Sequence, residues 1–169
     1  MTIYFVCIIS FLIAQRLLEL AISHRNERWL RQHGAIEYGQ KHYPFIIALH
    51  SFFLISLIVE YWINPSDKVD LFFLIFYIIM AALKYLIITS LGRYWNTKIF
   101  RIPNSPAIRT GLYRWIRHPN YVVVVGEIFA IPMIFHLYFT AIVFSLINGI
   151  MLWIRIGMEN AVWNEKQNV

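Results

Sequence analysis

The sequence predicts an all-α, polytopic membrane protein with about five transmembrane helices, the last two of which form a hairpin. Of its 169 residues, 59% are hydrophobic and 14% are charged, whereas a soluble domain is about half apolar and about a quarter charged. Long apolar segments also recur along the chain. Backbone groups in lipid must be satisfied within the segment, so these segments are predicted to be helices. The length fits one domain, residues 1–169.

Five apolar segments have lengths near the roughly 20 residues that a helix needs to cross a bilayer. In chain order they are residues 3–21, 44–63, 71–91, 121–135 and 138–154. The first follows no basic stretch and is not followed by a small-residue cleavage site, so it is predicted to be a span and not a removable signal peptide. The last two are short and separated mainly by His136, which predicts a tight helical hairpin.

Basic residues are concentrated in alternate loops. Residues 22–43 contain four Lys or Arg side chains and residues 92–120 contain six, whereas the second loop has only Lys68. The positive-inside rule therefore places the first loop, the third loop and the C-terminus in the cytoplasm, with the N-terminus outside. Because the charges lie in short loops between spans, the net charge of +6 does not indicate a nucleic-acid partner.

The third loop, residues 92–120, is the longest connection. Pro103, Pro106 and Gly111 predict ordered turns within it. A long loop in so small a membrane protein is a candidate functional element. It also divides the domain into three N-terminal spans, residues 1–91, and a C-terminal part, residues 92–169.

Several ionisable residues lie within the predicted spans, where they are costly and are candidates for function. Arg16 and Glu19 are one helical turn apart, which predicts a local ion pair. Glu60 is expected to reach the outer headgroups, and Lys84 to extend to the membrane surface. Glu127 lies two turns into the fourth span, so its carboxylate must face a partner or a polar cavity, with a direct or a supporting role at a site.

Residues 117–121, Arg-His-Pro-Asn-Tyr, stand at the start of the fourth apolar segment. Pro119 suits the first turn of a helix, where its missing N–H is not needed. The free N–H groups of that turn favour an anion such as a carboxylate or a phosphate. The alternative is an interfacial cap, with Tyr113, Trp115 and Tyr121 as an aromatic belt.

Arg155 and Glu159 are four residues apart and therefore share one helix face. Because the fifth segment returns to the side where the fourth begins, both are expected to line the same pocket as His118. The histidines show no metal-ligand spacing, and no metal site is expected. No dinucleotide fingerprint or P-loop is present in the sequence.

Residues 111–113, residues 117–121 and the Arg155-x-x-x-Glu159 pair together resemble the isoprenylcysteine carboxyl methyltransferase family. The similarity is strongest from Trp95 to Glu159. The N-terminal part resembles the small bacterial branch, which includes proposed alkylpyrone O-methyltransferases. Phospholipid N-methyltransferases and some membrane sterol reductases carry related C-terminal motifs.

The resemblance implies an integral membrane enzyme that uses S-adenosylmethionine, bound by the third loop and neighbouring helix ends. The implied cofactor-binding residues are Ala107, Ile108, Tyr113, His118, Pro119, Asn120, Tyr121 and Glu159. Arg155 would sit at the methyl-acceptor group as a catalytic residue, and Glu127 is a second catalytic candidate that could mark a different acceptor in this branch. Val123 and Asn160 stand where many members have glycine and a second glutamate, and the chain stops ten residues after Glu159. These departures concern the acceptor pocket, so a prenylcysteine acceptor is not the expected one.

The expected function is methyl transfer from S-adenosylmethionine to an acidic oxygen, a carboxylate or a hydroxyl, of a lipophilic small molecule. The expected location is a bacterial cell membrane, among its lipids, with the site facing the cytoplasm. Three alternatives remain open at this point: a phospholipid or other lipid N-methyltransferase, a membrane reductase that uses a nicotinamide cofactor, and a non-catalytic membrane scaffold. The oligomeric state is left open.

Overall fold

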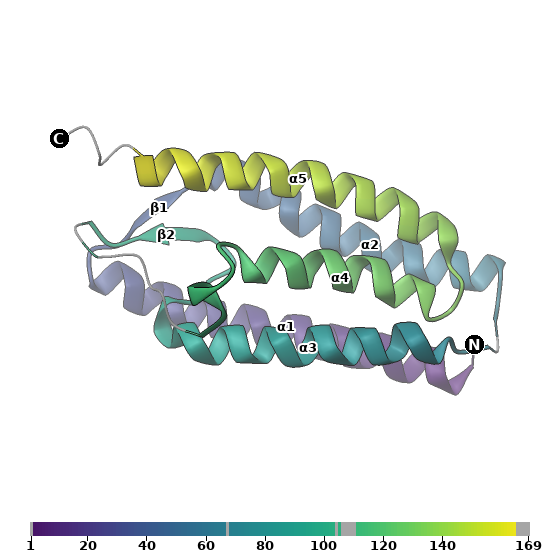
Figure 1. The fold of residues 1–169 in the computed structure, drawn as a ribbon. Helices are drawn as coiled ribbons and strands as arrows, with labels where there is room; N and C mark the ends of the chain where they lie inside the picture. Colours follow the sequence, from purple (N-terminus) through teal and green to yellow (C-terminus); the bar gives the residue numbers. More distant parts are fainter. Residues whose placement is uncertain (1, 67, 104, 106–110, 165–169) are drawn as a thin grey trace.

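The computed structural model describes residues 2–66, 68–103, 105 and 111–164 and confirms the all-α class (Figure 1). Its long helices are α1 (Ile3–Gln32), α2 (Tyr43–Ile63), α3 (Leu71–Leu91), α4 (Pro119–Met133) and α5 (Tyr138–Asn164). Four of them, all except α4, are long and apolar enough to cross a membrane. At 15 residues, α4 is about 22 Å long and falls short of a bilayer core of about 30 Å.

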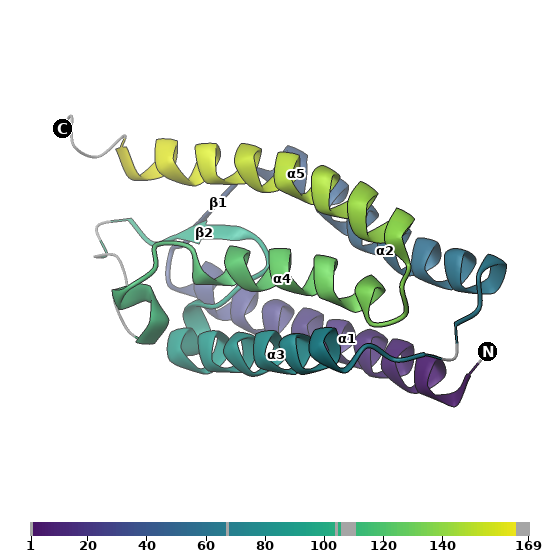
Figure 2. The ribbon, with the colours of Figure 1, turned by 45° about the vertical axis from the view of Figure 1, so that its right-hand side comes forward.

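A two-stranded antiparallel sheet joins the two basic loops. Strand β1 (Ile36–Tyr38) pairs with β2 (Ile99–Arg101), so that Glu37 lies opposite Phe100. The first and third loops therefore lie at the same end of the helices, as their charges predict. The start of α4 and the end of α5 lie at this end too (Figure 2). Three short 3-10 helices complete the loops: η1 (Gln40–His42), η2 (Gly92–Tyr94) and η3 (Gly111–Arg114).

Helix α4 is the central helix of the fold. It packs between α3 and α5, and α5 packs in turn against α2. Gly126 permits a close approach on the α3 side, because a Cβ atom there would lie only 2.7 Å from the sulfur of Met80. The shortness of α4 is tolerated because neighbouring helices surround much of it.

The hairpin turn between α4 and α5 is buried in the protein. Ile134, Phe135 and Leu137 are each at most 1% exposed, and the backbone N–H of Asp70 donates to the Ile134 carbonyl at 2.9 Å. Glu60 accepts hydrogen bonds from the backbone N–H groups of Phe139 and Thr140. Its carboxylate therefore stabilises the first turn of α5, and its contact with the outer headgroups stays a prediction.

Four charged side chains from α1, α3 and α4 form a buried ion network: Arg16, Glu19, Lys84 and Glu127. The predicted ion pair between Arg16 and Glu19 is present at 2.8 Å. The expectation for Lys84 is wrong, because this residue is only 3% exposed. Its ammonium pairs with Glu127 and lies 2.9 Å from Glu19.

Neutral groups complete the hydrogen bonding of the ion network. The amide nitrogen of Gln15 donates to Glu19 at 3.0 Å and to Glu127 at 3.2 Å. The Tyr77 hydroxyl donates to the amide oxygen of Gln15 at 2.9 Å. Two positive and two negative charges thus balance one another in a region where unpaired charge is expensive.

Replacing Lys84 by methionine should destabilise the protein by about 3–5 kcal/mol, because two buried carboxylates lose their shared cation. The measurement is thermal unfolding in detergent, with Lys68→Met as a control, since Lys68 is an exposed lysine. Equal unfolding midpoints for the two variants would contradict a structural role for the ion network.

Candidate functional site

The start of α4 and the end of α5 bring together four residues singled out from the sequence: His118, Tyr121, Arg155 and Glu159. Nδ1 of His118 lies 3.2 Å from a carboxylate oxygen of Glu159. The Tyr121 hydroxyl donates to the other oxygen of Glu159 and accepts a hydrogen bond from Nε of Arg155 at 2.8 Å. We refer to these four residues as the helix-end cluster.

Two local features position the helix-end cluster. Pro119 is the first residue of α4 and is buried, so the helix begins directly after His118. On α5, the four-residue spacing of Arg155 and Glu159 places both side chains toward α4. The imidazole of His118 stacks on the Tyr121 ring, with the ring planes 12° apart and the centroids 5.3 Å apart.

Arg155 also connects α5 to the third loop. Its terminal nitrogen donates to the backbone carbonyl of Thr97 at 2.7 Å, and its guanidinium carbon lies 5.5 Å from the centre of the Tyr121 ring. The side chain is thus held from two directions, by Tyr121 of α4 and by Thr97, two residues before β2.

Tyr113 lies beside the helix-end cluster, on η3. Burial, together with the negative charge of Glu159 and against the opposing charge of Arg155, raises the pKa of its hydroxyl to about 12. The hydroxyl therefore stays neutral near pH 7. Gly111 fixes η3 against the end of α3, because it has a φ of +55° and a Cβ atom there would lie 2.5 Å from the Ser90 hydroxyl.

A cavity of about 50 Å³ lies between α2, α4 and α5 and reaches Arg155. Its lining is mostly apolar, with a few polar groups. The lining residues are Ile46, Leu49, His50, Asn120, Tyr121, Val124, Asn148, Met151, Leu152 and Arg155. We refer to this space as the interhelical cavity.

His50 and Asn148 were not predicted as site residues. The sequence does hold a signal for both, because each is a polar side chain inside a predicted apolar span. The signal is weaker for uncharged side chains than for charged ones, because an uncharged polar group costs less to bury.

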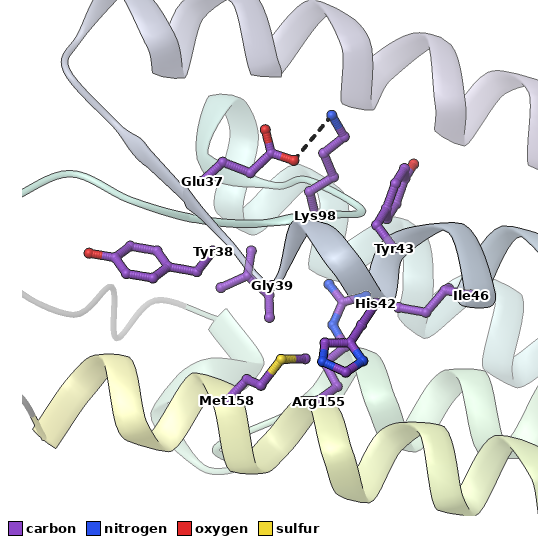
Figure 3. Close-up of a pocket in the computed structure, with 10 residues that line it drawn as sticks. Glu37, Tyr38, Gly39, His42, Tyr43, Ile46, Lys98, Arg155 and Met158 are labelled. Atoms are coloured by element: carbon purple, nitrogen blue, oxygen red, sulfur yellow. Dashed lines mark ion pairs between the residues drawn. The ribbon is translucent and has the colours of Figure 1, made fainter.

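A second, smaller hollow lies on the loop side of Arg155, between β1, the start of α2 and the end of α5. Figure 3 shows Arg155 and Met158 extending from α5 toward Gly39 and His42. Lys98 closes one side through ion pairs with Glu27 and Glu37. Burial lowers the pKa of Lys98, but the hydrogen bonds and charges of these carboxylates outweigh that effect and raise it above its usual range.

The remaining predicted residues fall in different places. Asn120 lines the interhelical cavity. Glu127 is 1% exposed, belongs to the ion network and is not among the residues that line the cavity, so a direct catalytic role for it stays a prediction. Ala107 and Ile108 lie outside the described residues.

The apolar helices and the polar helix-end cluster define an integral membrane protein with a site at the loop end of its helices. Comparison with protein families makes the assignment more specific. The isoprenylcysteine carboxyl methyltransferase (ICMT) family model matches residues 73–165, more than half of the chain, and the protein belongs to this family of membrane methyltransferases. The match contains all but the first two residues of α3, together with the third loop, α4, α5 and the helix-end cluster.

Two relatives match along nearly the whole chain. One is a Bacillus subtilis (strain 168) protein described as "Uncharacterized protein YpbQ", 38% identical over 160 residues that cover 94% of this chain and 95% of the relative. The other is an uncharacterized protein of Haemophilus influenzae, 30% identical over 165 residues that cover 94% of this chain and 92% of the relative. No solved structure matches.

The Tyr121 hydroxyl should contribute more to stability than an exposed one, because it bonds both Arg155 and Glu159. Tyr121→Phe should therefore cost about 1–3 kcal/mol of unfolding free energy, measured by denaturant titration in mixed micelles. Tyr85→Phe, which removes a hydroxyl from a side chain that is 68% exposed, is the control and should be nearly neutral. If the two variants unfold alike, the central place of this hydroxyl is wrong.

Proposed function

We propose that the protein transfers the methyl group of S-adenosylmethionine to an acidic oxygen of a lipophilic acceptor at the membrane. One observation carries the proposal: in a chain of the ICMT family, the Tyr121 hydroxyl links Arg155 to Glu159 and, through it, to His118. Arg155, which suits an anionic acceptor, therefore lies beside Glu159 and His118, which suit the cofactor. Methyltransferases of this family use S-adenosylmethionine as methyl donor.

The residues present fit that cofactor. Nε2 of His118 is buried and has no hydrogen-bond partner among the described residues, so it is available to a ligand. With a hydrogen on each ring nitrogen, His118 would donate from Nδ1 to Glu159 and from Nε2 to the carboxylate of the cofactor, beside the free N–H groups at the start of α4. Glu159 suits its amino group or its ribose hydroxyls, and the faces of Tyr113 and Tyr121 suit its sulfonium cation.

When bound, S-adenosylmethionine supplies an electrophilic methyl group. The protein's part is to orient the acceptor and to exclude water. Arg155 uses its Nε and one terminal N–H for Tyr121 and Thr97, which leaves its remaining N–H groups for an anionic oxygen. When an anionic acceptor reacts with the sulfonium cation, the two charges are neutralised, so surroundings poor in water favour the transfer. Holding the acceptor oxygen close to the methyl group supplies much of the rate.

The interhelical cavity suits a lipophilic acceptor, because apolar side chains form most of its wall. The positive charge of Arg155 at its end favours an acidic oxygen over the cationic amine of a lipid headgroup. This is why we prefer O-methylation to lipid N-methylation.

We further propose that the loop end of the helices faces the cytoplasm of a bacterial cell. The basic residues of the first and third loops support this orientation. It gives a water-soluble cofactor access to His118 and Glu159, while the acceptor arrives from the bilayer.

The direct test is calorimetry of S-adenosylmethionine binding to the protein purified in detergent. Wild type should bind, and His118→Ala should weaken binding about tenfold or more, because a charge-assisted hydrogen bond is lost. Arg155→Ala should abolish transfer of radiolabelled methyl groups into lipid extracted from the source bacterium while leaving cofactor affinity within about threefold. Arg25→Ala, at an exposed position, is the control.

Two outcomes would contradict the proposal. If folded wild-type protein does not bind S-adenosylmethionine, the methyltransferase function is refuted. If Arg155→Ala loses cofactor affinity and turnover to the same extent, Arg155 belongs to the cofactor site and not to the acceptor site.

A further inference from the structure

We propose that His50 binds the methyl acceptor, and that its Nε2 accepts a hydrogen bond from a hydroxyl group of that acceptor inside the interhelical cavity. The inference rests on the proposed function and makes the acceptor more specific: its nucleophilic oxygen is a hydroxyl and not a carboxylate.

The geometry of His50 assigns the roles of its two ring nitrogens. Nδ1 lies 2.8 Å from the backbone carbonyl oxygen of Ile46, one turn earlier on α2. A carbonyl can only accept, so Nδ1 carries the hydrogen, and Nε2 of the neutral ring has a free lone pair. That nitrogen is buried and has no partner within the described part of the chain, and a buried polar atom without a partner needs an explanation.

Two more polar side chains, Asn148 and Asn120, line the same cavity. Asn148 on α5 is only 3% exposed, and Asn120 stands in the first turn of α4. Within the ranges that the structure describes, neither side-chain amide makes a hydrogen bond. Each of three helices therefore contributes one polar group with unused hydrogen-bonding capacity to a cavity whose other walls are largely apolar. This is the usual composition of a small-molecule site.

The depth of these groups suits a molecule that enters from the bilayer. Asn148 lies seven residues before Arg155 on α5, about 10 Å further from the loop end. His50 lies two turns into α2. One amphiphile can therefore meet Arg155, His50 and Asn148 together, with its chain against Leu49, Val124 and Met151.

Charged groups of other helices act on His50. Arg16 and Glu19 of α1 and Lys84 of α3 act on it electrostatically, and Arg155 lines the cavity from α5. Three charges of the ion network thus act on a residue that lines the acceptor cavity, and we expect the network to support the site.

Because Nε2 is a hydrogen-bond acceptor, it favours a methyl acceptor that carries a hydrogen-bond donor. A hydroxyl can donate to this lone pair, whereas a carboxylate brings no hydrogen, and Arg155 disfavours an ammonium. As the acceptor oxygen forms its bond to the methyl carbon, the hydroxyl proton passes to Nε2 and is later released to solvent. The carbon–sulfur bond breaks with its electron pair remaining on sulfur, so the products are a methyl ether, a neutral thioether and one proton.

The test uses radiolabelled pentadecylphenol as the probe, with purified full-length protein saturated with S-adenosylhomocysteine, the demethylated form of the cofactor, so that the phenol binds without being methylated. Calorimetry first confirms that each variant binds the cofactor within about twofold of wild type. His50→Leu should then bind the phenol about tenfold more weakly, the size expected for a buried hydrogen bond. His50→Gln, whose amide oxygen accepts a hydrogen bond, should recover most of this loss.

A matched control is available in His24, whose Nδ1 lies 2.8 Å from the Leu20 carbonyl in the same one-turn geometry, but on an exposed residue. His24→Leu should leave phenol binding unchanged. Wild type should also methylate pentadecylphenol in preference to palmitic acid and hexadecylamine.

The inference is overturned if His50→Leu binds cofactor and phenol like wild type, if wild type binds cofactor but not the phenol, or if palmitic acid or hexadecylamine is the better acceptor. Failure of wild type to bind S-adenosylmethionine is a different result, because it refutes the proposed function itself.

Discussion

The site depends on the double hydrogen bond of the Tyr121 hydroxyl, which accepts from Arg155 and donates to Glu159. Without it, the start of α4 and the end of α5 would present separate charges at a polar interface. With it, an arginine and a carboxylate of one helix are held in fixed positions against a histidine of the other. Arg155 extends this arrangement to the third loop through the Thr97 carbonyl.

Helix α4 is held by polar contacts on two sides. On the α5 side, Tyr121 joins the helix-end cluster. On the α3 side, Glu127 pairs with Lys84, and Gly126 lets the two helices approach closely. A short helix that cannot cross the bilayer alone is thereby fixed in position and orientation, and this is what a site at its first turn requires.

Much of the architecture follows from the sequence because it depends on simple quantities. Segment length and hydropathy predict the helices, and the distribution of basic residues predicts that the first and third loops share one end. The spacing of Arg155 and Glu159, with the hairpin that precedes them, predicts their meeting with His118. The chemical roles of these residues came from resemblance to the family, since the same side chains also suit an interfacial cap.

Other features could not be predicted, for physical reasons. Hydropathy shows that a segment lies in lipid but not which helix each face meets, so Lys84 was expected at the surface although it pairs with Glu127. Strands β1 and β2 are each three residues long and pair across more than sixty residues, and no local pattern indicates such a pairing. His50 and Asn148 are uncharged, and their importance appears only when three helices enclose them.

The central claim is that cofactor binding occurs where α4 begins and α5 ends. Hydrogen–deuterium exchange with and without S-adenosylmethionine tests it most directly, since it reports local protection of backbone amides without knowledge of the acceptor. We expect the cofactor to slow exchange in residues 118–122 and 155–160 and to leave the opposite end, residues 60–66 and 71–75, unchanged. Two results would contradict the account. In the first, the cofactor slows exchange only at the opposite end; in the second, a saturating cofactor concentration slows exchange in neither residues 118–122 nor residues 155–160.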